Sequence, residues 1–168
     1  GDLVKAFEKT LGPNNYNLIG SGRTDSGVHA NHQIGNIKLK TKMSSIEIKN
    51  AINANTKNDI CINNCEKVDD SFNARFSAIK REYVYKLTNK KSPISRMYTW
   101  QISFKINEKL LQDSAKLIIG KYDFSSFCKA SSLKENNFCE VYNSNWIFQE
   151  EVLVYKIIAN RYLHHMVR

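Results

Sequence analysis

Residues 20–30, with the sequence GSGRTDSGVHA, place the tightest constraint on the fold, because they hold three of the seven glycines in a chain of 168 residues. Glycine adopts backbone conformations that other residues avoid, and it lets a ligand approach the main chain closely. The segment is not a Walker loop, and Asp25 stands where a dinucleotide-binding fingerprint needs a glycine. The stretch predicts a loop that presents the Asp25 carboxylate, or, as the simpler alternative, a turn in which Asp25 bonds its own backbone.

The charge balance is basic, with a formal net charge of +9 and a pI near 9.4. Such an excess favours polyanions, because each neutralised phosphate releases counterions. An organism whose proteins are generally rich in lysine and asparagine would give the same charge to a protein that binds no nucleic acid. Composition therefore leaves open whether the partner is a nucleic acid. No window approaches 18 apolar residues, which predicts no transmembrane helix. The first ten residues lack a signal-peptide pattern, and we therefore expect a cytoplasmic protein.

Neither the cysteines nor the histidines have the spacing of a convincing metal site. The pairs Cys61/Cys65 and Cys128/Cys139 lack a nearby histidine that would complete a zinc set. The adjacent positions of His164 and His165 predict that their side chains point in different directions. The sequence therefore predicts four reduced thiols and no metal site.

Three segments have the pattern of helices. Residues 3–14 form an amphipathic run that ends in Gly12 and Pro13, and residues 107–120 form a longer one that begins at Asn107 and ends at Gly120. Ser44 and Glu47 have the spacing of a capping box before a third helix at residues 46–55.

Strand patterns alternate with these helices. They cover residues 33–40, 59–69, 81–89, 143–149 and 151–160. In the strand at 81–89, Tyr83, Tyr85 and Leu87 share one face. The last two strands are expected to pair. The fold class predicted from these elements is α+β, with antiparallel hairpins and a few helices.

Two further segments combine charge with aromatic or apolar residues. Arg75 lies among apolar neighbours in residues 72–78, so it either snorkels or meets a buried carboxylate or phosphate. The strand face that carries Tyr83 and Tyr85 either packs in the core, with the hydroxyl groups reaching solvent, or presents a ring that stacks on a nucleobase. Arg168 ends the segment HHMVR at 164–168, which is either a surface turn or the source of a second cation for Asp25.

Taken together and in this order, these segments resemble the TruA-type tRNA pseudouridine synthases. Residues 22–30 match the family signature G-R-T-D-x-G-V-H-A throughout. The similarity continues over nearly the whole chain, through Asn53-Ala54-Asn55, FNARFSA at 72–78, Arg81-Glu82-Tyr83, DFSSF at 123–127 and HHMVR at 164–168. One departure is Cys139, which stands where many relatives carry an arginine.

The resemblance implies a pseudouridine-synthase-like α+β fold, in which two similar halves with flanking helices surround an RNA-binding cleft on a continuous, mainly antiparallel mixed sheet. We expect the halves to be residues 1–70, with the Asp25 loop, and residues 71–168. The family's first strand and its closing C-terminal segment are not found in this sequence. The implied activity is conversion of uridine to pseudouridine in the tRNA anticodon stem-loop, at positions 38 to 40, by a homodimer without a cofactor.

Carried over residue by residue, the resemblance places Asp25 on the catalytic aspartate and Tyr83 on the tyrosine that stacks on the target base. Arg23, Arg75 and Arg168 fall on active-site arginines, and Arg168 is counted with the catalytic residues. His29 and His165, which lie inside matched motifs, are further candidates for substrate binding.

The chemistry fits these residue types but leaves two routes open. Asp25, as an anion stabilised by Arg23 or Arg168, either attacks C1′ or removes a proton from C2′. Tyr83 is expected to stack on the base first, and proton transfer is its second role, because an ordinary tyrosine is a poor base at neutral pH. The alternative to an enzyme is a non-catalytic basic RNA-binding module.

Overall fold

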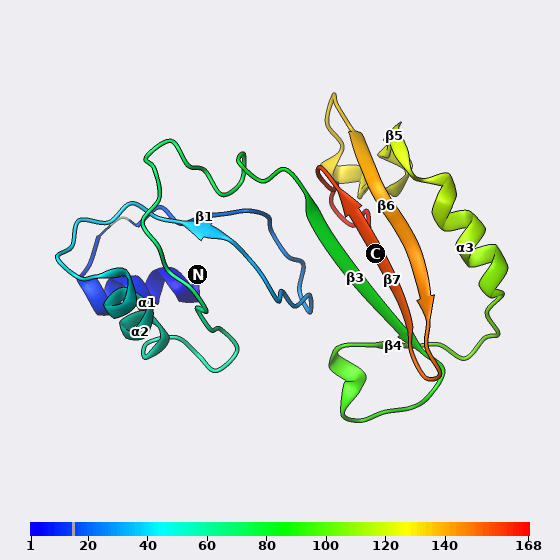
Figure 1. Ribbon diagram of the computed structural model, residues 1–168, viewed down its shortest axis with the longest axis horizontal. Helices are drawn as coiled ribbons and strands as arrows, with labels where there is room; N and C mark the ends of the chain where they lie inside the picture. Colours follow the sequence, from blue (N-terminus) through cyan, green and yellow to red (C-terminus); the bar gives the residue numbers. More distant parts are fainter. Residues whose placement is uncertain (15) are drawn as a thin grey trace. The chain divides into compact units, whose positions relative to one another are not determined.

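The computed structural model describes residues 1–14 and 16–168, and internal contacts group them into two units (Figure 1). The N-terminal unit consists of Gly1–Arg23 and Asn31–Ser77, and the C-terminal unit of Thr24–Ala30 and Ala78–Arg168. The turn that carries Asp25 therefore belongs to the same unit as the end of the chain. Among the described residues, no helix has the length and apolar character needed to cross a membrane.

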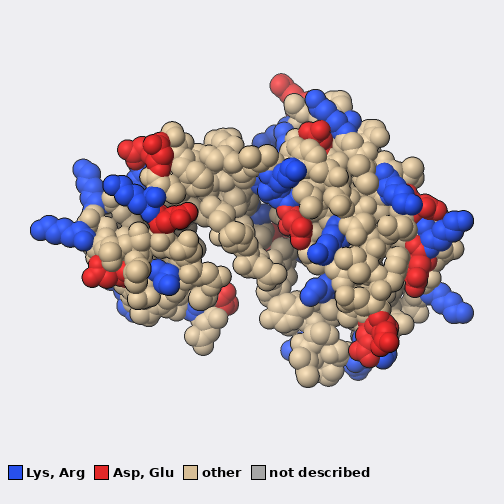
Figure 2. Space-filling model, in the orientation of Figure 1, with Lys and Arg blue, Asp and Glu red and all other residues tan. Residues whose placement is uncertain are grey.

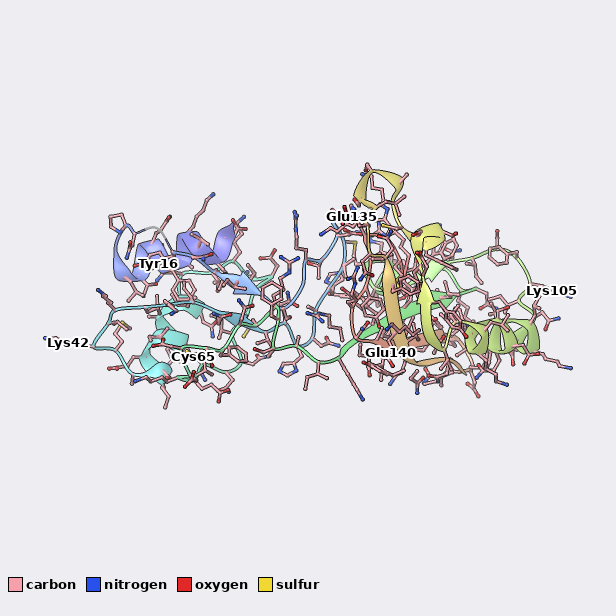
Figure 3. The ribbon with its side chains drawn as sticks, turned by 90° about the horizontal axis from the view of Figure 1, so that it is seen from above. Tyr16, Lys42, Cys65, Lys105, Glu135 and Glu140 are labelled. Carbon is pink, nitrogen blue, oxygen red and sulfur yellow. The ribbon has the colours of Figure 1, made fainter. Side chains whose placement is uncertain are left out.

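Two helices form the N-terminal unit's core, and the sequence predicted both. Helix α1 (Asp2–Leu11) ends at Gly12, whose φ of 88° is a left-handed value that glycine adopts easily. Helix α2 (Ser45–Asn53) begins with the predicted capping box between Ser44 and Glu47. Ala6 and Phe7 of α1 pack with Ile52 of α2, which is fully buried. Tyr16, labelled beside α1 in Figure 3, adds a ring 6.0 Å from that of Phe7.

The strands of the N-terminal unit are shorter than predicted. Strand β1 (Ile19–Gly20) pairs antiparallel with β2 (Gly35–Asn36), so the strand expected over 33–40 is reduced to two residues. The strand expected over 59–69 was wrong. In this segment the backbone of Ile62 bonds a side chain instead of a neighbouring strand. The Asn53 side chain donates to the carbonyl of Ile62 (2.9 Å) and accepts from its N–H (2.7 Å).

A five-stranded sheet organises the C-terminal unit, in the order β4-β3-β7-β6-β5. Its strands are β3 (Arg81–Thr88), β4 (Trp100–Gln101), β5 (Gly120–Asp123), β6 (Phe138–Phe148) and β7 (Leu153–Ala159). Neighbours are antiparallel except for β3 and β4, which are parallel, so the sheet is mixed. Figure 1 shows β3, β7 and β6 side by side.

Helix α3 (Glu108–Leu117) lies along β6, where the Gln112 side chain accepts a hydrogen bond from the Trp146 N–H at 3.1 Å. Asn107 caps α3 as predicted, by accepting from the Leu110 N–H. Gly120 begins β5, which the sequence pattern did not predict. Three 3-10 turns complete the unit: η1 (Ser95–Met97), η2 (Ser125–Phe127) and η3 (Ala130–Ser132).

The observed elements confirm the α+β class and the strands predicted at 81–89, 143–149 and 151–160. The last two pair in antiparallel fashion, from Leu153 opposite Phe148 to Ala159 opposite Val141. Hydrogen bonds join β1 and β2 into one sheet and the other five strands into a second. The described residues therefore do not form the single continuous sheet that the resemblance implies.

The core of the C-terminal unit lies on one face of the large sheet. It consists of Phe124, Cys139, Val141, Ile157, Ala159 and Met166. Cys139 is 1% exposed, and burial raises the pKa of its thiol. Cys139 is thus a small apolar residue of the core. All four cysteines are free.

Replacement of Ile52 by alanine tests the helix core of the N-terminal unit. Ile52 is fully buried, so Ile52→Ala should lower the free energy of unfolding by about 2–5 kcal/mol. Ile46 lies on the same helix at 68% exposure, so Ile46→Ala should change it by less than about 0.5 kcal/mol. Urea denaturation followed by circular dichroism measures both, and equal effects would contradict this packing.

Candidate active site around Asp25

Asp25 begins a tight turn. The Val28 N–H donates to the Asp25 carbonyl at 3.1 Å, and Gly27 at the third position has a φ of 80°. A positive φ at this position is typical of a type II turn and strains any residue with a side chain larger than that of glycine. Gly27 is therefore the glycine of the 20–30 stretch whose conformational freedom the backbone uses. The hydrogen bond that closes the turn joins backbone atoms, and the carboxylate points elsewhere.

A second turn, at residues 164–167, brings the histidine doublet to the same place. His165 has a φ of 70°, a left-handed conformation that is uncommon outside glycine. The Met166 N–H donates to the Leu163 carbonyl at 3.1 Å, and the Met166 side chain is buried in the core. The turn is thus anchored by one apolar side chain while its two histidines stay exposed to solvent.

Both imidazoles face the Asp25 carboxylate. The Nε2 atom of His164 lies 3.4 Å from Oδ1, and the Nε2 atom of His165 lies 3.5 Å from Oδ2. The expectation that adjacent histidines point in different directions was therefore wrong. The reason is the left-handed backbone at His165, which breaks the alternation of an extended chain and places the two rings 4.3 Å apart.

Ser132, at the end of η3, holds His164 from the other side. Its Oγ lies 2.8 Å from Nδ1 of His164, and the Lys129 N–H donates to the His164 carbonyl at 3.0 Å. Sequence reasoning missed His164 as a partner of Asp25, although the doublet itself was a visible signal. It also missed Ser132, for which the sequence has no signal, because the contact spans 32 residues.

The Arg168 side chain contacts the backbone of the Asp25 turn. One of its guanidinium nitrogens donates to the carbonyl of Ser26 at 3.3 Å. The side-chain contacts described for the Asp25 carboxylate are with the two histidines. Arg168 is therefore placed to hold the position of the turn, and the imidazoles of the histidine doublet lie against the carboxylate itself.

Tyr83, on β3, is half-buried beside Tyr162. Their ring centroids lie 4.7 Å apart in an edge-to-face arrangement, and Tyr162 Oη donates to the carbonyls of Arg81 (3.1 Å) and Ile157 (2.9 Å). Burial raises the pKa of Tyr83, and the Asp25 carboxylate acts in the same direction, whereas Arg81 opposes both. The phenol is therefore a worse base at neutral pH than an ordinary tyrosine, which favours stacking over proton transfer.

The remaining candidates lie apart from this cluster or on the other unit. His29 follows the Asp25 turn and lies against Tyr98, with ring centroids 4.7 Å apart. Arg23 and Arg75 belong to the N-terminal unit and are exposed. The guanidinium of Arg75 lies 5.5 Å from the centre of the exposed Phe76 ring, a cation–π contact.

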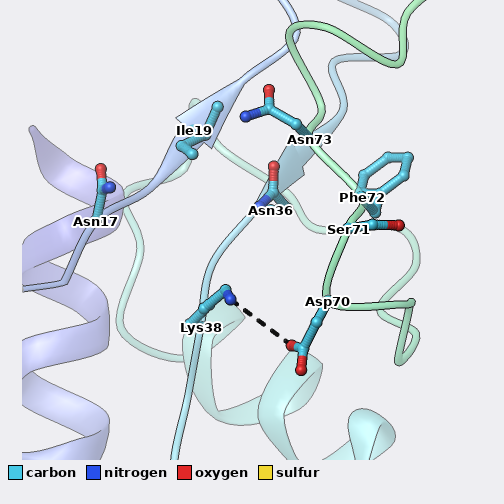
Figure 4. Close-up of a pocket in the computed structure, with 8 residues that line it drawn as sticks. All are labelled: Asn17, Ile19, Asn36, Lys38, Asp70, Ser71, Phe72 and Asn73. Carbon is cyan, nitrogen blue, oxygen red and sulfur yellow. Dashed lines mark ion pairs between the residues drawn. The ribbon is translucent and has the colours of Figure 1, made fainter.

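The N-terminal unit has a polar pocket of about 280 Å³ that sequence reasoning did not identify (Figure 4). Lys38 and Asp70 form an ion pair across 3.8 Å in it. The amide oxygens of two of its asparagines serve the local backbone, because Asn36 accepts from the Ala74 N–H and Asn73 from the Arg75 N–H. These two side chains therefore shape the 72–76 segment.

Positive charge is spread over the molecule. Figure 2 shows Lys and Arg side chains scattered over the visible face of each unit, with Asp and Glu between them. This arrangement agrees with the sequence, which has 25 Lys and Arg against 16 Asp and Glu without a block of like charge. A distributed excess of this kind suits an extended polyanion better than a single small anion.

The raised pKa of Tyr83 has a measurable consequence at high pH. Because burial favours its neutral form, that stabilising contribution is complete below about pH 10 and is lost as pH rises through the higher pKa of the folded state. Spectrophotometric titration of tyrosinate should show a late phase that Tyr83→Phe reduces. In urea, the parent and variant should both titrate near pH 10, and a late phase of unchanged size in the variant would contradict the burial of Tyr83.

Comparisons with known proteins identify the family of this chain. A family profile described as tRNA pseudouridine synthase matches residues 114–168. The chain is 38% identical over 168 residues to tRNA pseudouridine synthase A of Thermoanaerobacter pseudethanolicus, covering 99% of this chain and 68% of the relative. It is 36% identical to the protein of the same name from Caldicellulosiruptor bescii, covering 100% and 69%, and 35% identical to tRNA pseudouridine synthase A 2 of Bacillus anthracis, covering 90% and 62%. The chain belongs to the tRNA pseudouridine synthase family.

Proposed function

We propose that this protein is an isomerase that converts uridine to pseudouridine in tRNA, with Asp25 as its catalytic carboxylate. The observation that carries the proposal is the Asp25 turn, whose partly exposed carboxylate lies beside two imidazoles within a sequence that matches the family signature. Relatives named tRNA pseudouridine synthase A, similar over nearly the whole chain, support the same activity.

The reaction needs no group from outside the substrate. The N1–C1′ bond breaks, the uracil turns, a C5–C1′ bond forms, and the proton on C5 leaves while N1 gains one. Asp25 must be ionised, either to attack C1′ or to remove the C2′ proton. Its side chain is 32% exposed, so solvent and substrate can reach it.

A uridine in a stem must first leave the base stack, which costs a few kcal/mol. We propose that Tyr83 offsets part of this cost by stacking on the uracil. Its half-buried ring is fixed by the edge-to-face contact with Tyr162, so little side-chain freedom is lost when the base arrives.

The other candidates have supporting roles in this proposal. Arg168 holds the Asp25 turn by its bond to Ser26, and His165 contacts the carboxylate directly. Arg23, Arg75 and His29 are proposed to bind the RNA backbone or the bases near the target, as exposed polar side chains can. The resemblance further supports the anticodon stem-loop, positions 38 to 40, as the target, a homodimer as the assembly and the cytoplasm as the location.

Loss of the Asp25 carboxylate tests the catalytic proposal. The parent should release tritium from unmodified tRNA labelled with [5-³H]uridine. Asp25→Asn keeps the shape of the side chain but removes its charge, and it should reduce release by at least about 10³-fold, because removal of a nucleophile costs up to about 10⁶-fold in other enzymes. A gel-shift assay should show that the variant still binds tRNA.

Asp113→Asn is the matched control, because Asp113 is an exposed aspartate on α3 that pairs across the surface with Lys116. Its rate should equal that of the parent. Binding of tRNA without tritium release by the parent would sink the catalytic proposal and favour the non-catalytic RNA-binding module. Mapping the modified positions in the product would test the preference for positions 38 to 40.

Two substitutions at Tyr83 separate stacking from hydroxyl chemistry. Tyr83→Ala removes the ring and should weaken tRNA binding by about 1–3 kcal/mol, or about 5- to 150-fold. Tyr83→Phe keeps the ring and should bind as the parent does. Equal weakening in both variants would argue against stacking, and an intact affinity with a reduced kcat for Tyr83→Phe would assign a proton-transfer role to the hydroxyl group.

A further inference from the structure

Three possible metal ligands meet at the Asp25 site. Asp25, His164 and His165 each contribute one ligand atom, and these atoms lie within 4.8 Å of one another. We propose that the three side chains bind a divalent transition-metal ion of the Zn²⁺ class, and that the bound ion blocks the Asp25 carboxylate reversibly. The inhibitory effect rests on the proposed function, whereas the binding itself does not.

The two contacts between imidazole and carboxylate are longer than direct hydrogen bonds. The separations of 3.4 and 3.5 Å between imidazole Nε2 and carboxylate oxygens exceed the usual 2.7–3.2 Å of an N–H···O bond. A tetrahedral ion with ligand distances of about 2.0–2.1 Å separates neighbouring ligand atoms by about 3.3–3.4 Å. The two contacts involve different carboxylate oxygens, and the three ligand atoms lie within 4.8 Å of one another, so an ion would draw the three side chains together as it binds.

The neighbours of the cluster also resemble those of a metal site. Ser132 Oγ lies 2.8 Å from the Nδ1 atom of His164. When Nδ1–H donates to Ser132, the lone pair of His164 is on Nε2, which is the atom that faces Asp25. At His165, the left-handed backbone places the second ring beside the first, with ring centroids 4.3 Å apart. The contact with Ser132 therefore orients one of the three ligands before an ion binds.

The ligand set selects the class of ion. Two imidazoles and one carboxylate suit Zn²⁺ and its neighbours Co²⁺ and Ni²⁺, whereas Mg²⁺ prefers oxygen ligands and keeps several waters. The three side chains are between 32% and 41% exposed, so a hydrated ion can reach them and keep a water in the fourth position. An ion held there occupies the carboxylate that the reaction requires to be unbound.

Cobalt provides a direct probe of this binding. Full-length protein, freed of metal by a chelator, should develop the visible absorption of tetrahedral Co²⁺ at a ratio near one per chain, and Zn²⁺ should abolish it. Asp25→Asn, His164→Gln and His165→Asn should each weaken Co²⁺ binding by at least about tenfold, because loss of even an outer partner costs about 10- to 100-fold. Asparagine is chosen at 165 because it tolerates a positive φ.

Two more variants guard against misfolding and unspecific binding. Ser132→Ala keeps all three ligands and should weaken Co²⁺ binding about tenfold or more. His32→Gln removes an exposed histidine of the N-terminal unit and should bind as the parent does. Equal binding by the parent and all ligand variants would overturn the proposal, and so would thiolate-to-metal charge transfer that disappears in Cys61→Ser/Cys65→Ser.

Activity provides a separate readout. Micromolar Zn²⁺ should stop tritium release by the parent, a chelator should restore it, and millimolar Mg²⁺ should not inhibit. If the parent lacks isomerase activity, the Co²⁺ titration still decides the binding proposal. If the parent is active but binds no Co²⁺ at these residues, the metal proposal fails and the proposed function stands.

Discussion

Strand β7 is the element on which the C-terminal unit depends, because it is hydrogen-bonded along its length on both edges. It pairs with β3 from Leu153 to Ala159 on one side and with β6 over the same residues on the other. A central strand of this kind has no open edge, and its inward side chains, Ile157 and Ala159, are almost completely buried. The position of Ala159, where the segment after β7 begins, is therefore fixed by hydrogen bonds on both sides.

The geometry of the site follows from that fixed point. Five residues after β7, the chain turns at the histidine doublet, and Met166 returns to the core so that His164 and His165 stay outside. Arg168 then ties the turn to the backbone of Ser26. The Asp25 turn comes from a distant part of the sequence, but it is grouped with this unit and meets the doublet there. An apolar anchor, a left-handed residue and one long-range hydrogen bond thus position three polar side chains.

The same arrangement explains why Tyr83 suits a stacking role. Its position on β3 places it opposite Ile157 of β7, and the edge of its ring is held by Tyr162. A ring supported in this way presents a defined surface while its hydroxyl group is kept neutral by burial. The step that needs an anion is assigned to Asp25. Its partly exposed carboxylate lies beside two imidazoles rather than apolar side chains.

Sequence patterns predicted the elements whose cause is local. The capping box of α2, the asparagine cap of α3 and the alternation of Tyr83, Tyr85 and Leu87 all depend on residues close together in the chain, and each was confirmed. The failures involve long-range or unusual backbone features. Residues 59–69 look like a strand, but Asn53 bonds the backbone of Ile62 instead of a neighbouring strand.

The histidine doublet shows the same limit within the site. Its residues were visible in the sequence, but the direction of the two rings depends on one positive φ that no pattern indicates for a histidine. The grouping of residues 24–30 with the end of the chain was anticipated only through the expected approach of Arg168 to Asp25.

A structure of the protein bound to tRNA would test the central claim most directly, namely that Asp25 and Tyr83 act on one extruded uridine. The account predicts that C1′ of this nucleotide lies about 3–3.5 Å from a carboxylate oxygen of Asp25, with the uracil against the ring of Tyr83. A bound tRNA whose bases all remain stacked, or whose extruded base lies away from Asp25, would contradict it.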